Sequence, residues 1–280
     1  MTNVMERPPA GPPQPPPTPP PRRAPLGVRM AWKVFAAVLV VAGLWWGTFN
    51  VVVLLAHEER VETEAFAAEG LASIDVRNSA GSVRVVATDG DTVEVRAEIS
   101  DGLRSTGERR EVVGDVLELN GTCPLIGSDW CRVSYEISMP RSLALVVRAD
   151  NGSVDVTGLT APADIDSDNG SIEASGMAGT LRLSSDNGSV EATALRSANV
   201  TADSDNGRVT LEFAAAPTTV VATSDNGSVE VTVPDDGEAY ALDLSSGNGS
   251  ENPDIRVDPA SPRSITIHTD NGTATARTAA

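Results

Sequence analysis

The sequence predicts an all-β repeat domain preceded by one transmembrane helix and a disordered proline-rich tail. The dipeptide Asn-Gly recurs seven times after residue 148, apolar and polar residues alternate on both sides of each copy, and a 23-residue uncharged segment precedes the repeats. From these observations we expect four parts: a disordered cytoplasmic tail at 1–30, a transmembrane helix at 31–56, a juxtamembrane linker at 57–72, and an extracellular β-repeat domain at 73–280.

The charge of the chain is negative and unevenly distributed. The formal net charge is −18 over 280 residues, but residues 1–33 hold one acid and five bases, a net of +4, which leaves −22 for the rest. A surface this acidic repels phosphate backbones. We therefore expect no nucleic-acid partner.

The first segment is rich in proline. Eleven of the nineteen prolines lie between Pro8 and Pro25. Such runs lack backbone donors for helix or sheet and are typical of extended polyproline II or disorder. A solvated tail is the simpler interpretation, and a docking peptide for a cytoplasmic partner is the alternative.

The uncharged segment from Val34 to Ala56 predicts a membrane anchor. Its 23 residues would span about 34 Å as a helix, enough for a hydrocarbon layer of about 30 Å. The apolar run is longer than that of a signal peptide, and Leu54 disfavours cleavage before Ala56. Basic residues precede it and acidic residues follow it, so the N-terminus is expected in the cytoplasm and the C-terminal domain outside the cell.

The repeats show strand–turn–strand periodicity. Apolar residues stand six and four positions before each Asn and return after each Gly, which indicates strands with one buried face. The intervals between copies are 18, 18, 19, 20, 22 and 23 residues. The turn residues that define the repeat are Asn151, Asn169, Asn187, Asn206, Asn226, Asn248 and Asn271.

Two architectures fit this pattern. Asn-Gly between apolar runs is a strong hairpin signal and would give an antiparallel meander or sandwich. A regular repeat of interchangeable units also suits a β-solenoid, or β-helix-like stack, in which Asn-Gly turns a corner of each coil. We favour the solenoid because the copies are nearly identical and one apolar residue recurs at the opposite corner, at Leu159, Met177 and Leu195. The last copies lose their apolar pairs, as expected of repeats that cap a stack.

The two cysteines, Cys123 and Cys131, are eight positions apart on the side expected outside the cell. In that compartment we expect a disulfide that closes the loop at 124–130. A zinc site would need further ligands nearby, and the sequence offers none.

Stacked repeats would align acidic side chains into rows. One row is formed by the residues before each Asn and is interrupted by Gly247: Asp150, Asp168, Asp186, Asp205, Asp225 and Asp270. A second row lies four residues after each Asn: Asp155, Glu173, Glu191 and Glu230. Such rows require water and salt, Arg182 and Arg208, or a bound cation to offset the repulsion.

Calcium is the cation that these acids would bind. The candidate ligands are the pairs Asp166 with Asp168 and Asp203 with Asp205, but the spacing of a known calcium loop is absent. We favour turn chemistry as the reason for these residues, and expect no cofactor. Motifs for a nucleophile elbow, a phosphate loop or a zinc protease are absent as well, so we do not expect an enzyme.

The Ser-Asp-Asn-Gly-Ser-Val-Glu repeats, the Asn78-Ser-Ala-Gly-Ser-Val83 opening and the loop between the cysteines resemble the bacterial β-strand-repeat family labelled "putative adhesin", a domain of unknown function. The resemblance covers about residues 73–276. With twenty Arg and one Lys, the chain resembles the membrane-anchored actinobacterial type.

The resemblance implies a single-pass cell-membrane protein with an exposed β-repeat domain. Our first hypothesis is a non-enzymatic protein that presents this acidic domain to an unidentified envelope or extracellular ligand. The alternative is a regulatory module, associated with envelope stress, that signals through the proline-rich tail.

Overall fold

The computed structural model describes residues 26–55, 58–101, 106–123 and 131–279. Of the tail predicted at 1–30, residues 1–25 lie outside them, and residues 26–30 belong to a helix. The chain divides into two units, Met1–Val52 and Val53–Ala280, and each is described by itself.

The first unit is dominated by helix α1 (Leu26–Leu55), which begins five residues earlier than the sequence predicts. Its segment Met30–Thr48 has a mean hydropathy of 1.6 and no buried residues. The Thr48 hydroxyl donates to the carbonyl of Leu44 at 2.8 Å, so its polar group is satisfied within the helix. This is one N-terminal apolar helix of the kind that serves as a signal sequence or a membrane anchor.

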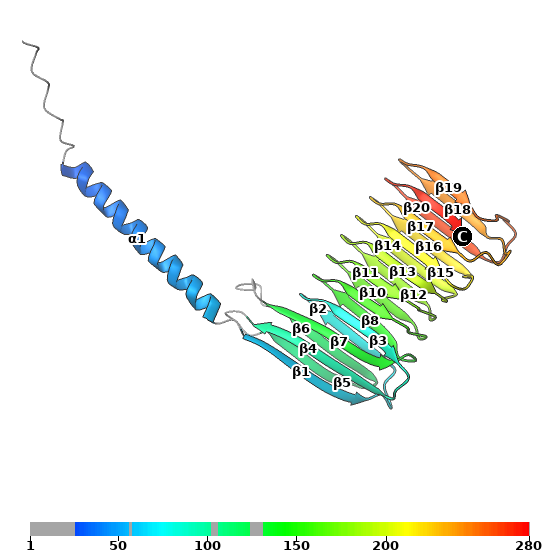
Figure 1. The fold of residues 1–280 in the computed structure, drawn as a ribbon, viewed down its shortest axis with the longest axis horizontal. Coiled ribbons are helices and arrows are strands. Elements are labelled where there is room, and N and C mark those ends of the chain that lie inside the picture. Colours follow the sequence, from blue (N-terminus) through cyan, green and yellow to red (C-terminus); the bar gives the residue numbers. More distant parts are fainter. Residues whose placement is uncertain (1–25, 56–57, 102–105, 124–130, 280) are drawn as a thin grey trace, which may run out of the picture. The chain divides into compact units, whose positions relative to one another are not determined.

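The second unit consists of two long β-sheets (Figure 1). In spatial order, the eleven-stranded sheet contains β1 (Glu58–Ala67), β4 (Thr92–Asp101), β7 (Arg132–Pro140), β3 (Val83–Thr88), β9 (Val154–Thr157), β11 (Ile172–Ser175), β13 (Val190–Leu195), β15 (Val209–Phe213), β17 (Val229–Val233), β21 (Ala274–Thr278) and β19 (Glu251–Asp254). The ten-stranded sheet contains β18 (Ala241–Ser246), β20 (Ser264–Thr269), β16 (Thr219–Ser224), β14 (Asn199–Ser204), β12 (Leu181–Ser185), β10 (Ala163–Ser167), β8 (Ala144–Ala149), β2 (Ser73–Asn78), β6 (Val116–Thr122) and β5 (Gly107–Val113).

Each repeat supplies one strand to each sheet, and successive repeats stack in parallel register. Ala163 of β10, for example, pairs with Leu145 of the preceding repeat and Leu181 of the following one. The two strands that flank an Asn-Gly pair therefore belong to different sheets, and the predicted solenoid is confirmed. The antiparallel meander is wrong for the repeats, because the Asn-Gly corner redirects the chain between sheets instead of folding it back on its neighbour.

The core lies between the two sheets and follows the predicted alternation. Of the fourteen apolar residues that precede the Asn residues, twelve are buried, and only Leu242 and Leu244 of β18 are half-buried. Leu159, Met177 and Leu195 are buried at the opposite corner. The small aliphatic side chains thus fill a thin, continuous core.

The order of coils in space differs from their order in sequence at the C-terminal end. The coil β20–β21 pairs with β16–β17, and the coil β18–β19 lies outside it as the last of the stack. The final copy of the repeat is therefore internal, with Ala274 and Ala276 fully buried, and our expectation that it caps the stack is corrected. Strand β19 occupies the end position instead. An edge strand tolerates Pro253, because proline has no backbone N–H to donate to a further strand.

The other end of the stack also contains a change of order. The coil β2–β3 pairs with both β6–β7 and β8–β9. Beyond β6–β7, strands β5, β4 and β1 are added in antiparallel pairing. Residues 58–67, expected in a linker, form β1. An edge strand buries little of either face, so β1 carries no strong apolar period for sequence reasoning to find.

Arg110 closes this end between the two sheets. It lies on β5, with a side chain only 5% exposed, and contacts Glu108 at 2.6 Å. It also lies 3.5 Å from Glu62 and 3.6 Å from Glu64 of β1. The guanidinium therefore joins the edge strand of one sheet to the edge strand of the other.

We expect Arg110→Ala to destabilise the chain by about 3–5 kcal/mol, because the substitution leaves the buried carboxylate of Glu108 without its cation. Urea unfolding of the full chain measures the change. Arg109→Ala is the matched control, since Arg109 is 77% exposed and 3.8 Å from Glu111, and should cost at most about 1 kcal/mol. Equal effects of the two substitutions would contradict the assigned role.

Candidate functional site: the Asn-Gly corner and its acidic rows

The seven predicted turn asparagines form one ladder along the stack. Six of the seven side-chain amides, all but that of Asn151, donate to the Oδ1 atom of the asparagine in the neighbouring coil, over 3.0–3.4 Å. The order in space is Asn151, Asn169, Asn187, Asn206, Asn226, Asn271 and Asn248. Five of these amides donate a second bond to the backbone carbonyl of the aspartate in the neighbouring coil.

A row of hydroxyls lies beneath the ladder, two residues before six of the seven asparagines; Ala149 takes this position before Asn151, and the hydroxyl residues are buried except for the half-buried Ser246. Ser204, for example, is 2% exposed and donates to the carbonyl of Gly188 at 2.9 Å. The same contact recurs in five other coils, from Ser167, Ser185, Ser224, Thr269 and Ser246. Sequence reasoning missed this row. The sequence signal for this row is a serine or threonine at a position that the alternation of apolar residues predicts to be buried.

The glycines allow the coils to approach closely at this corner. A Cβ atom added to Gly188 would lie 2.1 Å from the carbonyl oxygen of Gly170, and one added to Gly207 would lie 2.0 Å from that of Gly188. Only a residue without a side chain fits at this distance. The Asn-Gly pair thus combines a ladder-forming amide with a backbone that can stack.

The first acidic row lies beside the ladder and is exposed. Because β20–β21 sits directly against β16–β17, Asp270 follows Asp225, and Gly247 stands at the end of the row. The predicted interruption by Gly247 is therefore wrong in space: six aspartates follow one another without a break. Like charges placed opposite one another on adjacent strands repel.

The second acidic row is offset by arginines at its two ends. It runs along the outer face of the eleven-stranded sheet, where Arg84 lies 3.1 Å from Asp155 and Arg277 lies 2.6 Å from Glu230. Thr210 separates Glu191 from Glu230 in the register. Between them, these contacts and the neutral threonine reduce the repulsion along the row.

The two candidate calcium pairs, Asp166 with Asp168 and Asp203 with Asp205, lie in separate coils. Asp166 and Asp203 lie two coils apart in the ten-stranded sheet, with Ser184 between them, and Ser184 donates to Asp203 at 2.7 Å. Asp168 and Asp205 belong to the first acidic row. Within the described part of the chain, no group of three or more His, Cys, Asp or Glu side chains is arranged to hold a metal ion.

An arginine lies close to the carboxylates of this part of the ten-stranded sheet. Arg182 is 3.9 Å from both Asp164 and Asp203. The pKa of Asp166 is raised above its ordinary value, first by burial and then by the charges of Asp168 and Asp186. Asp166 therefore binds a proton at higher pH than an isolated aspartate does.

His268 ends the first acidic row with a polar network that sequence reasoning missed. Its Nδ1 atom is 2.8 Å from the hydroxyl of Ser245, and its Nε2 atom is 3.0 Å from Oδ1 of Asp270. When Nε2 carries the proton it donates to Asp270, and Nδ1 then accepts from the serine. The residues meet because Ser245 and His268 are paired in register on β18 and β20.

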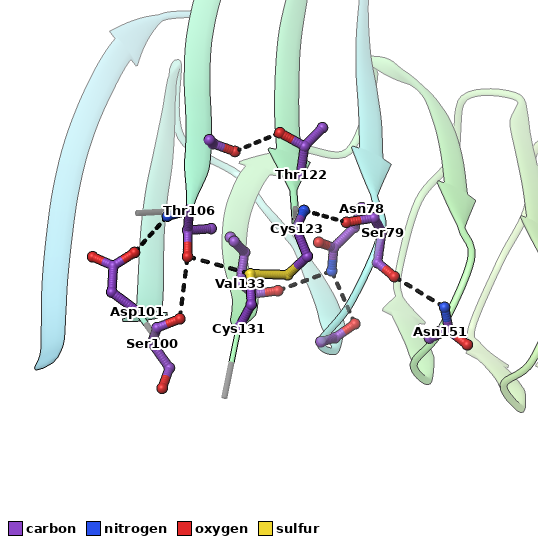
Figure 2. The surroundings of a disulfide bond; sticks show 12 residues. Asn78, Ser79, Ser100, Asp101, Thr106, Thr122, Cys123, Cys131, Val133 and Asn151 are labelled. Carbon is purple, nitrogen blue, oxygen red and sulfur yellow. Dashed lines mark hydrogen bonds between the residues drawn. A yellow bond between two sulfur atoms is a disulfide. The ribbon is translucent and has the colours of Figure 1, made fainter. Parts of the chain in front are cut away.

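A disulfide between Cys123 and Cys131 occupies the same corner in the coil β6–β7, with 5.7 Å between the Cα atoms (Figure 2). The backbone N–H of Cys123 donates to the hydroxyl of Ser79 at 2.8 Å, and the amide of Asn151 donates to the carbonyl of Ser79 at 3.2 Å. The disulfide therefore closes the corner next to the start of the ladder. The predicted loop at 124–130 lies outside the described residues.

The disulfide is also tied to the segment that follows β4. The Thr106 hydroxyl lies 3.3 Å from Sγ of Cys131, and its backbone N–H donates to Asp101 at 2.6 Å. Burial would raise the pKa of Asp101, but the hydrogen bonds from Thr106 and the nearby Arg60 outweigh it and hold this pKa below its usual value.

These features define a class of protein: a β-solenoid whose repeated corner presents aligned rows of amides and carboxylates. A family model described as Toastrack DUF4097 matches residues 134–278, more than half of the chain. The chain belongs to this family, and the resemblance inferred from the repeats is confirmed. No enzymatic family is indicated.

Several solved structures are similar to the chain. A "putative cell adhesion protein" from Clostridium sporogenes ATCC 15579 is 12% identical, with a TM-score of 0.38 over 79% of this chain and 100% of that one. A "putative adhesin" from Bacteroides fragilis NCTC 9343 is 16% identical, with a TM-score of 0.43 over 79% and 97%. No curated protein matches the chain.

We expect Asn206→Ala to destabilise the stack by about 1–3 kcal/mol, because it removes several ladder hydrogen bonds at once. Thermal and urea unfolding of the full chain measure the loss. Asp205→Ala is the matched control at the adjacent position: it removes one charge from a row of like charges and should be neutral or stabilising. A larger cost for Asp205→Ala than for Asn206→Ala would contradict the importance of the ladder.

Reduction of the disulfide should lower the free energy of unfolding by about 2–3 kcal/mol, as expected for a closed loop of this length. Urea unfolding with and without a thiol reductant measures the difference. The double variant Cys123→Ser with Cys131→Ser should be insensitive to the reductant. Wild-type stability that is unchanged by the reductant would show that the closed corner contributes nothing.

Proposed function

We propose that the chain is a non-enzymatic, single-pass membrane protein that displays its β domain outside the cell to bind an envelope or extracellular ligand. Helix α1 acts as an uncleaved anchor. Arg22, Arg23, Arg29 and Lys33 precede or begin its apolar part, and Glu58, Glu59 and Glu62 follow the helix. The positive flank favours a cytoplasmic N-terminus and therefore an extracellular β domain.

The observation that carries the binding role is the regular surface of the stack. Eleven strands at a spacing of about 4.8 Å extend roughly 48 Å, and the asparagine amides and aspartate carboxylates of the corner repeat at that spacing over seven and six successive coils. Two hollows on the sheet faces are small and polar, at about 200 Å³ and about 210 Å³. An extended surface of this kind suits a repetitive polymer better than a small molecule.

The first acidic row is the part of this surface that we propose as the contact. Its six exposed aspartates follow one another on successive coils, and they stand beside a rigid ladder of asparagines whose side-chain oxygens can accept a further hydrogen bond. A ligand that carries cationic or hydroxyl groups along its length would meet both rows at once.

The test is co-sedimentation of liposomes carrying the full chain with isolated cell envelopes, with calcium and with a chelator. We expect pelleting in both conditions, and a loss of pelleting when Asp168, Asp186 and Asp205 are all replaced by Asn. The charge-matched control replaces Glu69, Asp235 and Glu238, which are exposed outside the rows, by their amides and should pellet like the wild type.

Other outcomes separate the alternatives. Pelleting only with calcium would assign a metal role to the aspartate pairs, including Asp166 and Asp203. Absence of pelleting in every condition would contradict the binding role. The regulatory alternative would then be favoured if deletion of residues 1–25 abolished an envelope-stress response, whereas adhesion should survive that deletion.

A further inference from the structure

The seven Asn-Gly pairs of the repeats share one chemical liability with the eighth pair of the chain, Asn120-Gly121, which is not part of the ladder. The backbone nitrogen of the glycine can attack Cγ of the asparagine side chain, which forms a C–N bond and a five-membered succinimide. The C–N bond to the side-chain amide breaks, and ammonia leaves with the proton from the glycine nitrogen. Water then opens the ring to aspartate or isoaspartate. Since the glycine follows the asparagine in every copy, local structure decides which copies react.

The internal asparagines are held away from this reaction. Asn206 donates to the carbonyl of Asp186 at 3.2 Å and to Oδ1 of Asn187 at 3.0 Å, and its own Oδ1 accepts from Asn226 at 3.1 Å. Coils lie against both sides of its backbone. Turning Cγ toward the glycine nitrogen would break three hydrogen bonds and move a backbone that has no room to move.

Asn248 is held differently, because it lies in the end coil β18–β19. Its amide donates to Oδ1 of Asn271 at 3.1 Å, and among the described residues nothing donates to its own Oδ1. The following Gly249 packs against the carbonyl of Gly272 on one side. Both strands of this coil are sheet edges, so no coil covers the other side.

Asn151, the first asparagine of the ladder, shows that an end position in the ladder does not by itself leave an asparagine with an open flank. Asn151 begins the ladder, yet the coil β2–β3 lies outside it, and Gly81 donates a backbone bond to the Asn151 carbonyl at 2.9 Å. Its Oδ1 accepts from Asn169 at 3.4 Å. Asn248 alone, of the seven, combines an open flank with an Oδ1 that accepts no bond from a described residue.

The geometry points to Asn248 as a site of spontaneous covalent modification, at which the folded protein converts asparagine to aspartate and isoaspartate while the internal ladder is preserved. Isoaspartate routes the main chain through the side-chain carbon and lengthens it by one bond. The product also places a carboxylate next to Asp270. Both changes weaken the attachment of the end coil to β20–β21.

The experiment is incubation of the full chain in detergent micelles at mildly alkaline pH, followed by proteolysis and mass spectrometry of each Asn-Gly peptide over time. We expect Asn248 to convert at least about tenfold faster than Asn206, which corresponds to 1.36 kcal/mol in the barrier. In urea the seven sites should convert at similar rates, which would assign the difference to the fold.

Two variants test whether the hydrogen bond to Asn271 controls the rate at Asn248. Asn271→Ala removes the acceptor for the Asn248 amide and should speed conversion at Asn248, whereas Asn169→Ala, at the other end of the ladder, should leave that rate unchanged. Equal rates at all seven sites in the folded chain, or faster conversion at an internal site than at Asn248, would overturn the proposal.

Discussion

The close approach of successive coils at the glycine corner is the constraint on which the rest of the structure depends. A Cβ at Gly170, Gly188 or Gly207 would lie only 2.0–2.1 Å from the carbonyl of the neighbouring coil. Because the glycines stack at this distance, the asparagine amides beside them reach one another and the serines beneath reach the glycine carbonyls. The parallel register of both sheets, and therefore the alignment of the charged rows, follows from this one contact.

The sequence predicts the regular part of the molecule well, for a physical reason. The alternation of apolar residues and the recurrence of Asn-Gly are local signals, and each repeat buries the same positions against its neighbours. The core residues, the corner asparagines and both acidic rows could therefore be located before the structure. The buried serines were visible in the repeat but are polar, so a pattern based on hydrophobicity passed over them.

The ends of the stack could not be predicted in the same way. Which coil lies beside which is decided by long-range pairing, and the spacing between repeats does not encode it. The loss of the apolar pair after Asn248, where Glu251 and Pro253 stand, is a local sign of an edge coil, yet nothing local indicates that β20–β21 inserts between this coil and β16–β17. The contact of Arg110 with β1 joins residues nearly fifty positions apart, and polar residues on two edge strands give no periodic signal.

The position of the coil β20–β21 has a consequence for how the end of the stack assembles. Strand β18 is hydrogen-bonded in its sheet only to β20, and β19 only to β21. The end coil therefore gains its neighbour only after β20 and β21 have paired with β16 and β17. Loss of residues 264–278 would remove one coil and also the surface on which the coil β18–β19 docks, so the two coils depend on each other for their place in the stack.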